Sequence, residues 1–166
     1  MEEKRLTKGN TIAFLEEDHR KLEKAIAGLT VDQMTEYPIA GRWTVKDIIA
    51  HIAAWNLELT GGINAILSDQ KPRFFDIGED EFNRRETERR KLWTVKQVLD
   101  EWQQSFHGLI GRMRKISDAE WEYEAPSLVW PNGSQVSVED LFGYRYKGEG
   151  HEGGHAKQIK DFFRTL

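Results

Sequence analysis

Three long stretches of the chain place apolar residues at alternating intervals of three and four, the spacing of one face of an α-helix. They run from Ile12 to Leu29, from Thr44 to Ser68 and from Thr94 to Ile116. Thr44 and Thr94 each begin a sequence, Thr-x-x-Asp or Thr-x-x-Gln, that is typical of a helix start. An apolar helix face is stable only when another element covers it. The stretches therefore predict helices that pack on one another.

A fourth helix is predicted from Ser137 towards the C-terminus. Four glycines between Gly148 and Gly154 fall inside it, and each interior glycine costs a helix about 1 kcal/mol relative to alanine. If this stretch is helical, another interaction must compensate for the stability that the glycines cost.

The region before this helix, residues 117–136, has no helical period, and its Trp130-Pro131-Asn132-Gly133 sequence is typical of a turn or small hairpin. The predicted fold class is all-α. We expect a four-helix bundle in one domain over residues 1–166, with a small irregular or hairpin insertion before the last helix. The dense charge from Glu79 to Arg90 predicts a solvated helix or a mobile cap.

Composition excludes several classes of site and partner. The 166 residues include no cysteine, so disulfides, thiolate ligands and a cysteine nucleophile are excluded, and any metal must be bound by imidazole, carboxylate or backbone. The net charge of −4 gives no basic excess for nucleic-acid binding. No stretch approaches the ~20 apolar residues that cross a bilayer, and residues 1–10 lack the apolar segment of a signal peptide. We expect a cytoplasmic protein with no membrane partner.

Three of the five histidines are candidates for one metal site. His151 and His155 are four residues apart, on the same side of a helix, and the apolar positions that follow them put this side inward. His51 lies on the apolar side of the second helix. Three neutral imidazoles inside a bundle suit zinc, nickel, copper or iron and leave coordination positions open for water or substrate. The alternative is that each is an ordinary hydrogen-bonded core histidine.

The other two histidines are assigned different places. His19 also lies on a core stripe, where it is a fourth ligand, a partner of a ligand or an ordinary core histidine, and we favour the last. His107 lies beside Phe106 and off the stripe, so it is expected to be solvated.

Residues 151–155 also spell His-Glu-x-x-His, the zincin protease pattern in which Glu152 would be the general base. Only eleven residues follow it, too few for the third-ligand segment of zincins, so a protease is not favoured. Glu58, about 10 Å along the helix from His51, is a more remote candidate base. We expect both glutamates to be surface residues. Trp43, Trp55 and Trp130 are candidates to line an aromatic pocket over the metal, with simple core positions as the alternative.

Two sequence motifs resemble those of the DinB superfamily, also called the DinB/YfiT-like metalloenzymes, and the likeness spans nearly the whole chain. One is the Trp-Thr-x-x-Asp helix start at Trp43, which precedes His51. The other is His-x-x-x-His-x-x-Gln-Ile in the last helix, where this chain has Ala156-Lys157 in place of the common Arg-Gly before Gln158. The segment from His51 through Trp55, with Pro72 and Asn83, also resembles the neighbouring ClbS/DfsB group.

The resemblance implies a bundle of up-down-down-up order. It implies His51, His151 and His155 as the ligands of one nickel, zinc, manganese or iron ion. It also implies a metal-dependent transferase, isomerase or hydrolase, in some relatives with a low-molecular-weight thiol as cosubstrate. Family likeness alone does not fix the reaction.

Our leading hypothesis is a metal-dependent hydrolase or thiol S-transferase that activates water or a thiol for attack on a small electrophilic metabolite or toxin. The alternative is a metal-free bundle of the ClbS/DfsB type that binds and sequesters a small apolar molecule. A third hypothesis is a homodimer that uses the charged segment from Glu79 to Arg90 as its contact surface.

Overall fold

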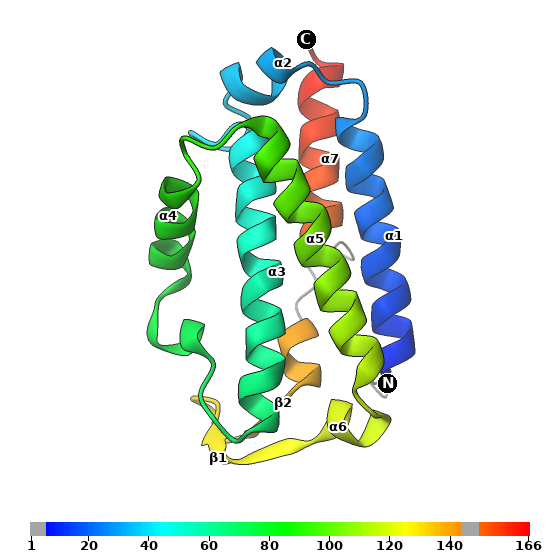
Figure 1. Ribbon diagram of the computed structural model, residues 1–166, viewed down its shortest axis with the longest axis vertical. Coiled ribbons are helices and arrows are strands. Elements are labelled where there is room, and N and C mark those ends of the chain that lie inside the picture. Colours follow the sequence, from blue (N-terminus) through cyan, green and yellow to red (C-terminus); the bar gives the residue numbers. More distant parts are fainter. Residues whose placement is uncertain (1–5, 144–149) are drawn as a thin grey trace.

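The computed structural model describes residues 6–143 and 150–166, and four long helices form a bundle in this part of the chain (Figure 1). They are α1 (Lys8–Ile26), α3 (Val45–Leu67), α5 (Val95–Lys115) and α7 (His151–Arg164). Helices α1 and α7 run in one direction and α3 and α5 in the other, which confirms the all-α bundle of up-down-down-up order. Helix α3 packs mainly on α5, and α1 mainly on α7.

Shorter elements fill the connections between these helices. They are α2 (Val31–Glu36), η1 (Arg73–Asp76), α4 (Glu79–Arg89), α6 (Asp118–Glu122), β1 (Glu124–Val129), β2 (Gln135–Ser137) and η2 (Glu139–Phe142). Because α3 and α5 run in the same direction, the chain between them must return along the whole bundle, and η1 and α4 lie on that return.

Side-chain caps fix where α3 and α5 begin, as the sequence predicts. The Thr44 side chain accepts a hydrogen bond from the Asp47 backbone, and the Asp47 side chain accepts one from the Thr44 backbone. Thr94 and Gln97 make the same reciprocal pair at α5. Each such cap stabilises a helix by about 1 kcal/mol. Between the caps, the apolar faces of the helices meet in the core, and none of the helices in the described ranges is long and apolar enough to cross a membrane.

The predicted insertion before the last helix is an antiparallel hairpin of β1 and β2, but the predicted start of the last helix is wrong. Ser137 pairs with Glu124 at the end of β2, so its backbone belongs to a sheet and not to a helix. The short η2 follows and ends at Gly143, and α7 begins only at His151. Gly148, one of the predicted helix glycines, lies outside the described residues.

A buried carboxylate from α1 caps the first turn of α7 and explains two of the glycines there. Asp18 is 2% exposed, and its Oδ2 accepts a hydrogen bond from the Gly153 backbone at 3.2 Å. A Cβ added at Gly150 would lie 2.3 Å from Oδ2, and one at Gly153 would lie 2.6 Å from Oδ1. The helix N-terminus carries partial positive charge, which favours this carboxylate. The glycines are therefore the condition for a close approach of α1 to α7.

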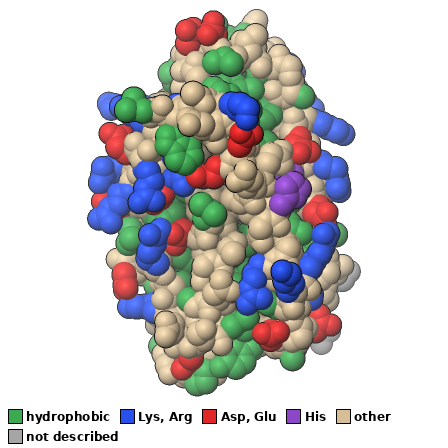
Figure 2. Space-filling model, in the orientation of Figure 1, with side chains coloured by type: hydrophobic (Ala, Val, Ile, Leu, Met, Phe, Trp, Pro, Cys, Tyr) green, Lys and Arg blue, Asp and Glu red, His purple; other side chains and the backbone are tan. Residues whose placement is uncertain are grey.

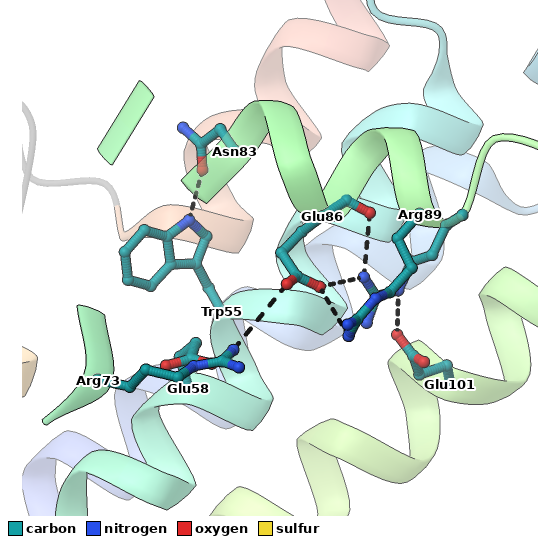
Figure 3. A network of polar contacts seen from close by, with 8 residues as sticks. Trp55, Glu58, Arg73, Asn83, Glu86, Arg89 and Glu101 are labelled. Atoms are coloured by element: carbon teal, nitrogen blue, oxygen red, sulfur yellow. Dashed lines mark hydrogen bonds and ion pairs between the residues drawn. The ribbon is translucent and has the colours of Figure 1, made fainter. Parts of the chain in front are cut away.

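A network of ion pairs holds α4 and the residue that follows it on the bundle, outside α3 (Figure 1 and Figure 3). The Arg90 side chain is 4% exposed and lies 2.6 Å from both Glu86 Oε2 and Glu101 Oε1. Arg73 of η1 bonds to Glu58 of α3 and approaches Glu86 at 3.9 Å. The predicted helix in this charged segment is confirmed, but one side of it is buried, and Lys and Arg side chains gather over its outer side at the left of Figure 2.

Replacing Gly153 by alanine is expected to lower the free energy of unfolding by about 1–2 kcal/mol, because the methyl group displaces the Asp18 carboxylate from the helix start. Gly154→Ala is the matched control, since a Cβ there meets nothing within 4 Å. It should raise the free energy of unfolding by up to about 1 kcal/mol. Urea unfolding in the presence of a chelator measures both. Equal responses of the two variants would contradict the role assigned to Asp18.

Removal of the Arg90 side chain is expected to lower the free energy of unfolding by about 3 kcal/mol, because it leaves the carboxylates of Glu86 and Glu101 without their shared buried partner. Arg89→Ala serves as the control. The Arg89 side chain is 65% exposed, and its loss should change stability by less than about 0.5 kcal/mol. Thermal unfolding of the two variants decides the matter, and a loss below about 1 kcal/mol for Arg90→Ala would refute the anchoring role.

Candidate metal centre

Three imidazoles meet between α3 and the first turn of α7. One nitrogen of each of His51, His151 and His155 lies within 4.8 Å of the other two. The Nε2 atoms of His51 and His151 are 2.7 Å apart. The ring centroid of His155 lies 5.5 Å from that of His51 and 5.0 Å from that of His151. The structure therefore brings together the three residues that the sequence selects.

The surroundings of these rings favour the neutral form, which is the form that binds metal. The pKa of His51 is lowered to about 3, mainly by burial and also by the neighbouring His155, while a polar contact with Asn83 acts in the opposite direction. Burial also lowers the pKa of His151, well below 6.5, and that of His155. Neutral imidazole nitrogens in a group of three fit a divalent transition metal.

Neighbouring side chains orient two of the three rings. The Nδ1 atom of His155 lies 3.1 Å from Gln158 Oε1, an acceptor, so Nδ1 carries the proton and Nε2 keeps its lone pair. Trp43, from the turn before α3, packs against the His51 ring with centroids 4.8 Å apart. The Nδ1 atom of His51 is buried without a partner in normal hydrogen-bond geometry among the described residues. These contacts leave the Nε2 side of the rings as the side that fits a metal ion.

Behind the triad lies a second buried polar group that the sequence does not predict. The Glu152 carboxylate accepts hydrogen bonds from Trp102 Nε1 at 2.5 Å and His19 Nδ1 at 2.9 Å. The other ring nitrogen of His19 lies 2.9 Å from Gln103 Oε1. The Gln103 amide is oriented by its own donation to Glu23 Oε1 at 3.0 Å. Both neighbours of His19 are acceptors, so both its nitrogens must donate and the ring is charged.

The pKa of His19 agrees with this assignment. Burial lowers the pKa, but the hydrogen bond and charge of Glu152, the bond to Gln103 and the charge of Glu23 together raise it above 6.5. His19 is thus a core histidine, as favoured from the sequence, and it is not one of the three grouped rings. His107 is exposed, as predicted.

The expectation that Glu152 is a surface residue is wrong, because the residue is 7% exposed. The sequence gives no signal for this burial, since the partners Trp102 and His19 come from other helices. Both carboxylate oxygens are already occupied, which argues against Glu152 as a general base. Glu58 is half-buried rather than a plain surface residue, and it bonds to Arg73.

The three candidate tryptophans do not share one site. Trp55 and Trp130 line one pocket, as expected, but Trp43 is not part of its lining and contacts His51 instead. Trp55 Nε1 donates to Asn83 Oδ1 at 2.8 Å, which joins α3 to α4 beside His51 (Figure 3). Asn83 therefore connects the pocket wall to the triad.

The sequence pattern of the DinB superfamily matches residues 15–159, a range that includes all three grouped histidines. The chain belongs to the DinB superfamily. No curated protein matches it. The separate likeness to the ClbS/DfsB group stays a prediction.

Solved structures share this DinB fold at low sequence identity. An uncharacterised protein from Escherichia coli UTI89 has a TM-score of 0.75 and 9% identity, over 96% of this chain and 94% of that one. A protein from Streptococcus pneumoniae has a TM-score of 0.76 and 10% identity, over 99% and 94%. A mycothiol-dependent maleylpyruvate isomerase has a TM-score of 0.73 and 15% identity, over 93% of this chain but 61% of the isomerase. These likenesses show the fold alone.

The charge on His19 predicts a pH-dependent stability. Because folding raises the pKa of His19 above 6.5, protonation stabilises the folded state below that pH, and the stabilisation is lost as the pH rises through the raised value. The free energy of unfolding lost on His19→Gln should therefore be larger near pH 6 than near pH 8. Urea unfolding of metal-free protein at both pH values is the measurement, with the exposed His107→Gln as control. A loss that is the same at both values would argue against a charged His19.

Proposed function

We propose that the protein is a metal-dependent enzyme in which His51, His151 and His155 bind one divalent transition metal, either nickel, zinc, manganese or iron. When bound, such an ion lowers the pKa of a water molecule or thiol and makes it a nucleophile at neutral pH. The reaction is hydrolysis, or transfer of a low-molecular-weight thiol, at a small electrophilic metabolite or toxin. The observation that carries the proposal is the convergence of three neutral imidazole nitrogens within 4.8 Å.

The residues of the chain divide the work between binding and orientation. The three imidazoles occupy three coordination positions of the ion, so at least one position remains for water or substrate. Gln158 sets the tautomer of His155, and the Asp18 contact fixes the first turn of α7, on which His151 and His155 lie. The buried Glu152 holds the same turn through its contacts with charged His19 of α1 and Trp102 of α5.

The use of a thiol is supported by one structural relative. The maleylpyruvate isomerase that shares the fold is described as mycothiol-dependent, which ties one protein of this fold to a low-molecular-weight thiol. For this chain a thiol cosubstrate is the finer part of the proposal. It is tested only after the metal has been found.

A second candidate function is the binding and sequestering of a small molecule without metal or catalysis. The half-buried rings of Trp55 and Trp130, which line one pocket, favour it. In that case the three histidines would be polar lining, and a variant with all three replaced by alanine would keep its affinity for the molecule. Metal content separates the two candidates.

Elemental analysis of the purified protein is expected to find about one equivalent of nickel, zinc, manganese or iron, and a large loss of it in His151→Ala. His107→Ala is the control, because His107 is exposed and lies outside the group of three. It should keep the metal of the wild type. Metal lost in His151→Ala alone would justify assays of thiol transfer and hydrolysis. If no sample holds metal and none takes it up on titration, the metalloenzyme proposal fails.

A further inference from the structure

A pocket of about 780 Å³ opens beside α3, between η1 and the tip of the β1–β2 hairpin. This volume lies in the range of small-molecule sites. Trp55 comes from α3, Phe74 and Phe75 come from η1, and Trp130 comes from the turn after β1. Three segments that are distant in the sequence therefore contribute to one lining.

The four aromatic rings of the pocket form a continuous row. Ring centroids lie 5.6 Å apart for Trp55 and Phe74, 5.1 Å for Phe74 and Phe75, and 5.0 Å for Phe75 and Trp130. The first two pairs meet edge to face and the third is tilted, so no ring of the row is stacked flat on its neighbour in the row. All four rings are only half-buried. Half-exposed aromatic rings that line a recess are suited to a ligand that stacks on them.

The near end of the row lies next to the triad. Trp55 follows His51 by one turn of α3, about 6 Å along the axis and on the same side of the helix. The Asn83 side chain accepts a hydrogen bond from the Trp55 indole and makes a polar contact with His51. A molecule stacked on the row therefore has one end close to the three imidazoles.

The charges at the pocket disfavour an anionic occupant. Its charged lining residues are Lys71 and Glu79, which have opposite signs. Lys71 is further neutralised by Asp76, 2.6 Å away. The rest of the lining is aromatic, aliphatic, proline or glycine. Lys71, Glu79 and Asp76 together carry a net charge of −1, so an anion gains no net attraction from this lining.

We infer that this pocket binds a planar aromatic or conjugated small molecule without negative charge and presents it to the triad as the substrate. The statement that the occupant is the substrate rests on the proposed function. The binding itself depends on the aromatic row and does not need the metal. Ligand binding in the pocket and the metal-dependent function can therefore be tested separately.

The test uses 2-naphthol as the planar probe and decahydro-2-naphthol as its saturated counterpart of similar size. Both are titrated into the full-length protein, as purified and again after chelation, and followed through the indole N–H signals in nuclear magnetic resonance spectra. The Trp55 and Trp130 signals, assigned with Trp→Phe variants, should shift saturably with naphthol. The saturated alcohol should bind at least about fivefold more weakly, because it cannot stack.

A matched pair of variants locates the binding. Phe75→Leu removes the central ring and keeps an apolar side chain, and it should weaken naphthol binding about fivefold. Phe162→Leu makes the same change at a half-buried ring of α7 that contacts Tyr37, outside the pocket, and it should change binding by less than about twofold.

Three results would overturn the inference: no saturable shift in the wild type, equal binding of the saturated alcohol, or equal effects of the two variants. If the protein holds metal but does not bind naphthol, the inference fails and the proposed function stands. If it binds naphthol but takes up no metal, the pocket stands as a binding site and the metalloenzyme proposal fails.

Discussion

The contact between the Asp18 carboxylate and the start of α7 determines where the candidate metal centre lies. A helix start buried in a bundle leaves several backbone N–H groups without partners, and a carboxylate from α1 satisfies one of them. The carboxylate approaches only because Gly150 and Gly153 have no side chain. With this contact made, α7 begins at His151, and its first turn places His151 and His155 against His51 of α3. Two residues without a side chain are thus the condition for the position of α7.

The same turn of α7 contacts histidines in opposite protonation states. Towards α3, burial without a carboxylate partner keeps His51 and His151 neutral. Around His19, the acceptors Glu152, Gln103 and Glu23 compensate for burial and keep the ring charged. Burial lowers the pKa of all three rings, so the difference in protonation comes from the hydrogen-bond acceptors and carboxylates around His19. The charged pair stays behind the neutral rings, where Trp102 and Gln103 complete its hydrogen bonds.

The periodic helices and the three histidines could be predicted from the sequence because each depends on local spacing. Helices α1, α3 and α5 follow the apolar stripe, and the starts of α3 and α5 follow from caps within four residues. The start of α7 could not be predicted from the sequence. Helix-like apolar spacing extends back to Ser137, but the backbone of Ser137 pairs with β1 in the hairpin. The burial of Glu152 and the reason for the glycines depend on residues more than a hundred positions away, at His19 and Asp18. Such contacts leave no local pattern.

The direction of the helices explains why the pocket lies on the connections and not in the bundle core. Since α3 and α5 run the same way, a long return segment is unavoidable, and it places Phe74, Phe75 and Asn83 along the side of α3 that carries His51. The buried Arg90 holds this return segment on the bundle, so its side chains keep a fixed distance from the triad. The imidazoles come from the packed helices, whereas three of the four rings of the row come from connections. Changes in η1 or the hairpin turn can therefore alter the ligand that binds while the three histidines stay in place, because contacts outside these two segments position them.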